Sequence, residues 1–413
     1  MTSGAHIGAA TGRPRVEGMT SRERMLTALR SGEPDHAPCA FMIFGALLGR
    51  CGTYEEFIER QLQMGLDAFV ELPPRPPVVA NDWYNLHGIQ VRYDQRVTVS
   101  EWVERIAGEA DPVLVKEYGT PAGTLRTEVR RTNDWRWGDH VPFLDDYLEP
   151  RSRKFLVTGP RDLDALRYLL VPPTEADRDA FRRECAPALA LARSRELLVA
   201  GGWGVGADLL GWVFGLENTM FASYDDPQFL SELLDLVGTW NRARMSLVLE
   251  AGIDLYIKRA WYENLDFWTP SSWRAHLMPL LRQEADLAHD RGAKLGYLIT
   301  ANCMPLLPMI AEAGADVVIG VDPREWDIVE AKRLLGGRVC LWGGVNGHLT
   351  VEQGSEGEVR SEVREAMRVL APGGGFILSP VDNVRHDTEL ARTNVAALVD
   401  EWHRLTGQEP TRP

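Results

Sequence analysis

Two short apolar runs, Leu295-Gly-Tyr-Leu-Ile299 and Asp316-Val-Val-Ile-Gly320, decide the fold. Neither run alternates apolar and polar residues, which indicates strands with both faces buried, as in a parallel sheet. Six further runs of this kind cover residues 39–44, 67–72, 197–201, 254–257, 339–342 and 375–378. Helical patterns separate most of the runs. Eight alternations of strand and helix favour a closed (β/α)8 barrel over an open sheet.

Signals at the ends of the predicted helices support this alternation. Thr20 and Glu23 have the spacing of a capping box, which marks the start of a helix. Asp226-Pro227 predicts the start of a long helix that runs to about Gly252, since proline is tolerated at the first helical position.

The composition excludes several classes of protein. The 413 residues are 45% hydrophobic and 25% charged, as in an ordinary globular protein. The net charge of −14, with both signs interspersed, argues against nucleic acid or an anionic membrane as a partner. No apolar run reaches the roughly 18 residues of a membrane span. The five cysteines form no C-x-x-C pair, and residues 1–18 lack an apolar signal core, so we expect a cytoplasmic protein with a disordered N-terminal tail.

One connection, between the second and third predicted strands, is much longer than the others. It contains pieces with β alternation, and Thr120-Pro-Ala-Gly-Thr-Leu125 has the pattern of a hairpin. We therefore predict a single barrel domain over residues 19–413 that carries a β-rich insertion at about 80–160. The insertion fits a lid or substrate wall, and it fits a role in stability or oligomerisation equally well.

In such barrels the reactive groups follow the carboxyl ends of the strands. The segment after the fourth strand contains Arg259, Tyr262 and Glu263. Arg259 is suited to binding a carboxylate through two hydrogen bonds, and Tyr262 and Glu263 are suited to proton transfer. The alternative is that Arg259 pairs with Glu263 and both are structural.

Other strand ends supply further candidates. Asp382 and His386 follow the eighth strand and are candidate acid–base groups. The candidate substrate-binding residues at the remaining strand ends are Glu71, Arg75, Trp203, Trp261, Asn302, Trp342 and Asn346. The glycine-rich segment 201–206 lacks the G-x-G-x-x-G spacing and the P-loop lysine, so it does not favour nucleotide binding.

Three segments and Asn394-Val395 of the last helix resemble a known family. The segments are Met-Pro-Leu-Leu-Pro-Met-Ile-Ala-Glu-Ala-Gly-Ala-Asp (304–316), Trp-Gly-Gly-Val-Asn (342–346) and Pro-Gly-Gly-Gly-Phe-Ile-Leu-Ser-Pro (372–380). They are similar to the uroporphyrinogen decarboxylase superfamily, which includes true uroporphyrinogen decarboxylases and corrinoid:coenzyme M methyltransferases. The resemblance covers roughly Met19 to Gly407 and implies a (β/α)8 barrel.

The decarboxylase signature is missing from this chain. The family's decarboxylases bind a macrocycle with four carboxylates through two arginines after the first strand and a late histidine. The matching positions here are Ile43, Leu47 and Pro380. Apolar side chains would leave the substrate's charges unpaired at a cost of several kcal/mol, which argues against haem-pathway activity.

The methyltransferase signature is missing as well. That branch binds zinc through a His-x-Cys pair after the fifth strand and a cysteine after the eighth. The matching positions are Leu298, Thr300 and Asp382, and leucine cannot bind zinc. A rebuilt site of Cys303, Asp382 and His386 is conceivable, but we expect neither a metal nor another cofactor.

These features predict an enzyme that acts on a small or medium organic acid. We expect proton-assisted decarboxylation or related lyase chemistry in specialised metabolism. Methyl or alkyl transfer, with a corrinoid protein as partner, is the alternative. A non-catalytic protein that binds a corrinoid or tetrapyrrole is the third interpretation. The resemblance also favours a homodimer.

Overall fold

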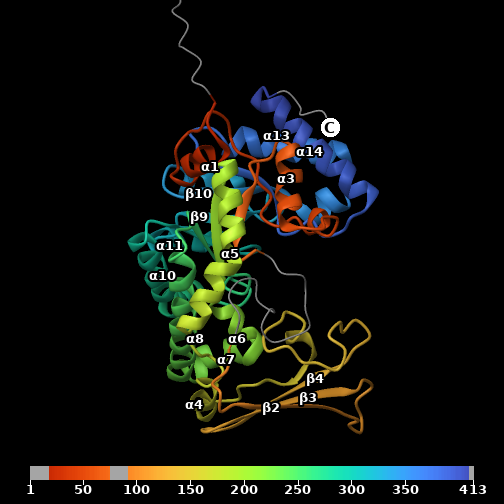
Figure 1. The fold of residues 1–413 in the computed structure, drawn as a ribbon, viewed down its shortest axis with the longest axis vertical. Helices are drawn as coiled ribbons and strands as arrows, with labels where there is room; N and C mark the ends of the chain where they lie inside the picture. The colour runs from red at the N-terminus through yellow and green to blue at the C-terminus, as the bar shows by residue number, and fades with distance from the viewer. Residues whose placement is uncertain (1–17, 75–91, 409–413) are drawn as a thin grey trace, which may run out of the picture.

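A parallel sheet lies at the centre of the protein, in a computed structural model that describes residues 18–74 and 92–408 (Figure 1). Its seven strands are ordered β1 (Phe69–Leu72), β6 (Leu198–Gly204), β7 (Leu255–Arg259), β8 (Lys294–Leu298), β9 (Val317–Val321), β10 (Cys340–Asn346) and β11 (Phe376–Val381). All neighbouring pairs are parallel. Seven of the eight predicted strands are thereby confirmed, and the fold is α/β.

The first predicted strand, residues 39–44, pairs more sparsely. Cys39 and Ile43 form isolated parallel bridges with Leu378 and Asn383 at the β11 edge. On the other side, the backbone N–H of Asp67, just before β1, donates to the carbonyl of Cys39 at 2.8 Å. The segment therefore contacts both edges of a sheet that curls.

The sheet separates two hydrophobic clusters. The inner cluster includes Leu255, Ile257 and Trp342, while the outer cluster includes Tyr256 and Tyr297 together with helix side chains. Because successive side chains of a strand point to opposite faces, β7 directs Leu255, Ile257 and Arg259 inward and Tyr256 and Lys258 outward. This alternation assigns the two charged residues of β7 to different environments.

Two helices begin where the sequence predicts. The hydroxyl of Thr20 accepts a hydrogen bond from the N–H of Glu23, which completes the capping box of the first helix, and the carboxylate of Asp226 caps the helix that begins at Pro227. The helices are α1 (Ser21–Leu29), α2 (Gly45–Leu48), α3 (Tyr54–Gln63), α4 (Leu163–Leu166), α5 (Glu175–Arg195), α6 (Ala207–Val213), α7 (Leu216–Asp225), α8 (Pro227–Leu249), α9 (Pro270–Ser272), α10 (Met278–Asp290), α11 (Leu307–Glu312), α12 (Ile328–Leu335), α13 (Glu356–Leu370) and α14 (Glu389–Thr406). Within the described residues, no helix is both long and apolar enough to cross a membrane.

A second, antiparallel sheet lies between β1 and β6 in the chain. Its strands are β2 (Thr98–Glu104), β3 (Val113–Thr120), β4 (Gly123–Arg130) and β5 (Ser152–Lys154), in that order. The predicted hairpin is confirmed, because Thr120 pairs with Gly123 across the β3–β4 turn. In Figure 1 this sheet lies at the end of the molecule away from α13 and α14. Arg75 and the predicted tail up to residue 17 lie outside the described residues.

Candidate active site

Arg259 is the centre of a charged cluster at the carboxyl end of β7. Its Nε donates to Oδ2 of Asp208 at 2.6 Å, and its Nη2 donates to Oδ1 of Asp146 at 2.5 Å. The Arg259 side chain is only 7% exposed. Within the described part of the chain, Arg259 thus pairs with these two aspartates and not with Glu263.

Aromatic rings enclose this guanidinium. Its central carbon lies 4.6 Å from the ring centroid of Trp212 and 4.2 Å from that of Trp261. Trp203 lies next to Trp261, with ring centroids 6.3 Å apart, and its indole N–H donates to Oε1 of Glu71 at 3.2 Å. Cation–π contacts of this kind are strengthened when the cation is shielded from water. The structure therefore brings the predicted Trp203, Trp261 and Glu71 to the side of Arg259.

Tyr262 belongs to the same cluster. Its hydroxyl donates to Oδ1 of Asp146 at 2.9 Å, and its backbone N–H donates to Oδ1 of Asp208 at 2.9 Å. Burial raises the pKa of Tyr262 above the ordinary value, and the negative charge of Asp146 raises it further. The phenol is therefore protonated at neutral pH and is a potential proton donor.

The two aspartates of the cluster differ in exposure. The side chain of Asp208, in the first turn of α6, is 0% exposed, whereas that of Asp146 is 42% exposed. Asp146 comes from the connection between β4 and β5, and it also accepts a hydrogen bond from the indole N–H of Trp212 at 3.1 Å. Solvent or a ligand can therefore reach Asp146 but not Asp208.

Sequence reasoning did not identify Asp146, Asp208 or Trp212. A signal existed for Asp208, because it follows a strand and its glycine-rich turn, where barrels place functional groups. No comparable signal marks Asp146, since its position depends on how the inserted segment returns to the sheet.

Glu263 lies in a different, closed cluster. Oε1 of Glu263 accepts a hydrogen bond from the N–H of Ala207 at 2.9 Å, and Oε2 accepts one from the hydroxyl of Tyr297. Lys258 Nζ lies 3.8 Å from Oε1 of Glu263 and 2.8 Å from Oε2 of Glu284 on α10. Burial raises the pKa of Glu263, and Lys258 opposes this shift. These partners place Glu263 in the core rather than beside Arg259.

The two acid–base candidates after β11 have different direct partners. Burial raises the pKa of Asp382, Arg385 and Arg259 lower it, and the charges of Asp146 and Glu352 raise it again. Asp382 therefore lies within electrostatic reach of both the Arg259 cluster and Glu352. His386 contacts another group, because its Nδ1 lies 3.0 Å from Oε2 of Glu352.

The remaining candidates make structural contacts. Trp342 is fully buried and its indole N–H donates to the carbonyl of Ala40 at 2.9 Å, so it fills the space enclosed by the sheet. Asn346 donates from Nδ2 to Oδ2 of Asp322 at 2.7 Å. Asn302 is exposed and its Nδ2 lies 3.4 Å from Oδ1 of Asp266. The structure does not bring these three side chains to Arg259.

The residues at the family's zinc positions do not fit the metal. Leu298 is buried in the inner cluster and has no ligating atom. Among residues 18–74 and 92–408, no group of three or more His, Cys, Asp and Glu side chains is arranged to hold a metal ion.

Comparison with known proteins gives one family. The family model of uroporphyrinogen decarboxylase (URO-D) matches residues 147–405, a segment that begins directly after Asp146. No curated protein matches the chain. Among solved structures, a methyltransferase from Methanosarcina mazei is similar over 94% of this chain and 99% of its own, with 19% identity and a TM-score of 0.57.

A second solved structure is less similar. D-psicose 3-epimerase from Clostridium cellulolyticum H10 covers 55% of this chain and 84% of its own, with 13% identity and a TM-score of 0.37. The likeness to the methyltransferase, at 19% identity, concerns the fold and not the activity.

Proposed function

We propose, because the chain belongs to the uroporphyrinogen decarboxylase family, that the Arg259 cluster is the active site of an enzyme that decarboxylates a small or medium organic acid. The observation that carries this proposal is the arrangement of Asp146. It is a half-exposed carboxylate held by one guanidinium, one phenol and one indole N–H. A substrate carboxylate has the same charge and geometry and would take its place.

Arg259 is the anion anchor of the proposed site. A charge-assisted hydrogen bond to a carboxylate is about twice as strong as a neutral one. The buried Asp208 stays in place and orients the guanidinium, so that Nη2 faces the position now held by Asp146. Trp212 and Trp261 stack on the guanidinium and exclude water, and they form an apolar wall for the substrate's carbon skeleton.

Tyr262 is the proton donor. When the bond between the substrate carbon and its carboxyl group breaks, carbon dioxide leaves and the electron pair remains on the carbon. The phenol of Tyr262 gives its proton to that carbon, and water returns a proton to the phenolate. Proton transfer by a positioned side chain contributes about 10²- to 10⁴-fold to a rate. Asp382 and Glu71 are further polar groups of the same site.

The proposal includes a closed barrel around this site. Segment 39–43 is taken as an eighth strand between β11 and β1, in line with its bridges to Leu378 and Asn383. The insertion then contributes Asp146 at the carboxyl end of that barrel.

The test is turnover of a defined panel of acids. The purified protein is incubated in D2O with small aromatic, dicarboxylic and 2-oxo acids, and carbon dioxide and deuterium in the product are measured. We expect at least one acid to release carbon dioxide and to give a product that contains deuterium. The double variant Arg259→Met/Asp208→Asn, which removes the buried pair together, should lower kcat/KM on the order of a hundredfold. If no acid is turned over, or if the double variant is as active as the wild type, the proposal fails.

Methyl transfer is the second candidate, and the fold shared with the Methanosarcina mazei methyltransferase favours it. It predicts that the protein methylates cob(I)alamin in the presence of a methyl donor, which the absorbance spectrum reports. Methylcobalamin without release of carbon dioxide would support this candidate and contradict decarboxylation.

A further inference from the structure

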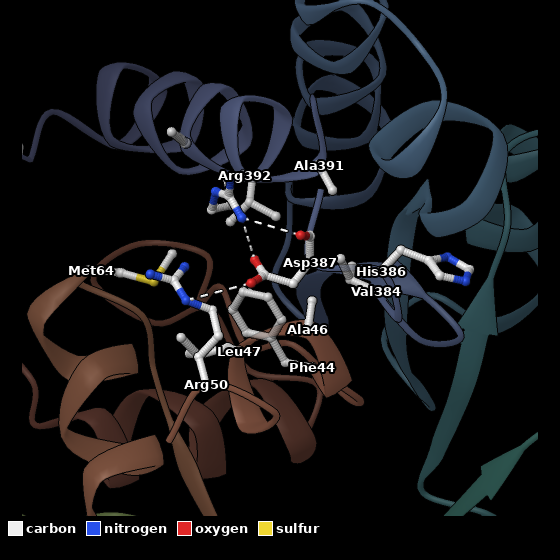
Figure 2. A pocket seen from close by; sticks show the side chains of 12 residues that line it. Phe44, Ala46, Leu47, Arg50, Met64, Val384, His386, Asp387, Ala391 and Arg392 are labelled. Atoms are coloured by element: carbon white, nitrogen blue, oxygen red, sulfur yellow. Dashed lines mark hydrogen bonds and ion pairs between the residues drawn. The ribbon is translucent and has the colours of Figure 1, made fainter. Parts of the chain in front are cut away.

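An apolar cavity lies apart from the Arg259 cluster, between the loop after β11 and the helices that surround it. Its volume is about 160 Å³. Helix α2, helix α14, the residue after α3 and the loop 384–387 border it, and Figure 2 shows the side chains that line it. The apolar lining consists chiefly of Phe44, Ala46, Leu47, Met64, Val384 and Val395.

The cavity has the size of a single aromatic ring. An apolar cavity of about 150 Å³ is known to hold benzene. The present cavity has a comparable volume and opens to solvent at its rim. No side chain among the six apolar lining residues offers a hydrogen bond, so the interior selects for a ring without polar substituents on its inner side.

The rim, in contrast, is charged. The carboxylate of Asp387 lies between two arginines: Nη1 of Arg392 donates to Oδ1 at 2.7 Å, and Nε of Arg50 lies 3.7 Å from Oδ2 (Figure 2). The three side chains are 38–47% exposed, so a ligand can reach them. Two guanidinium groups share one carboxylate, which leaves these three side chains with a net charge of +1.

We propose that this cavity binds a monocyclic aromatic carboxylate of the benzoate class. The ring occupies the apolar space beside Phe44 and Leu47, and the carboxylate contacts the exposed guanidinium groups of Arg50 and Arg392 beside Asp387, where it neutralises the excess positive charge. A neutral ring would leave the rim charge uncompensated, and an aliphatic anion would leave the apolar space unfilled. This site is independent of the function proposed for Arg259.

The first experiment fills the cavity. Benzoate is titrated into the full-length protein and binding is measured by calorimetry. Ala396 lines the cavity from an exposed position of α14, so Ala396→Trp places a large ring there without disturbing the core. The matched control is Ala186→Trp, at an exposed position of α5 outside this cavity. We expect benzoate to bind the wild type and the control but not Ala396→Trp. Equal binding by all three proteins, or by none, overturns the proposal.

The second experiment tests the charge and separates the two sites. Arg50→Gln should weaken benzoate binding about tenfold and leave the binding of benzyl alcohol unchanged, because loss of one charge-assisted hydrogen bond affects only the anion. The variant Arg259→Met/Asp208→Asn should keep its benzoate affinity. Loss of benzoate binding in that double variant, with retention in Ala396→Trp, would place benzoate at Arg259 and contradict a second site.

Discussion

Lys258 and Arg259 are neighbours on β7, yet they lie on opposite faces of the sheet. The clusters around them differ in the exposure of the carboxylates that hold the cation. Each cation is held by two carboxylates. Both partners of Lys258, Glu263 and Glu284, are 1% exposed. Of the two partners of Arg259, one is sealed in the core, and the other, Asp146, is 42% exposed.

This difference distinguishes a structural cluster from a candidate site. The Lys258 cluster lies between the sheet and its helices, where water and ligands have no access. Its direct partners are buried, although Asp208 of the Arg259 cluster lies within electrostatic reach of Lys258 and Glu263. Breaking a buried pair leaves a charge without compensation, whereas exchanging a half-exposed partner for another anion does not. An ion pair therefore indicates function when one partner is replaceable, and not merely because it is buried.

The largest effect is expected at Lys258. Lys258→Met leaves Glu263 and Glu284 without their cation, which costs about 3–5 kcal/mol of the free energy of unfolding. Lys294→Met is the control, since Lys294 is paired with Asp316 near the surface and such pairs contribute about 0–1 kcal/mol. Urea unfolding followed by circular dichroism measures both values. Equal losses of stability in the two variants would contradict a structural role for the Lys258 cluster.

A matched pair of tyrosines gives an intermediate effect. Tyr297→Phe leaves the buried Oε2 of Glu263 without its hydroxyl donor, at a cost of about 1–3 kcal/mol in the free energy of unfolding. Tyr262→Phe removes a hydrogen bond to the half-exposed Asp146, which water can replace, and should cost less than about 1 kcal/mol. The same urea titration compares the two variants. A larger loss of stability in Tyr262→Phe than in Tyr297→Phe would show that the Arg259 cluster is the closed one.

A smaller effect on stability than at Lys258 is expected at Asp146. Asp146→Asn removes the half-exposed partner of the buried Arg259 but leaves Asp208 in place, so it should change the free energy of unfolding by less than the ~3–5 kcal/mol expected for Lys258→Met. It should also tighten the binding of a substrate acid, on the order of tenfold, because the acid no longer competes with Asp146 for Arg259. Calorimetric titration with the acid that is turned over measures this affinity, and an unchanged or weaker affinity would argue against displacement of Asp146.

The sequence predicts the strands and helices around this site better than the side-chain contacts within it. Apolar runs and capping boxes locate the strands and helices because those signals are local, and the barrel rule leads directly to Arg259 and Tyr262. The placement of Glu263 is not local, because its partners Ala207 and Tyr297 come from distant segments of the chain. The contribution of Asp146 depends on how the insertion folds back, which no periodicity encodes.

How deep a side chain lies in the space enclosed by the sheet is equally hard to predict from the sequence. The strand alternation that places Trp342 on the inner face does not say whether the ring fills the interior or lines its opening. Packing against Phe69, with ring centroids 5.5 Å apart, decides that it fills the interior.

The central claim is that catalysis belongs to the Arg259 cluster. Its most direct test compares the turnover rates of Tyr262→Phe and Tyr297→Phe. Both variants lose one hydroxyl group, and both are assayed for deuterium incorporation with the best acid of the panel, at a temperature where each is folded. The account predicts that Tyr262→Phe loses about 10²- to 10⁴-fold in kcat while Tyr297→Phe keeps a rate close to that of the wild type. Full activity in Tyr262→Phe, or an equal loss in both, would contradict it.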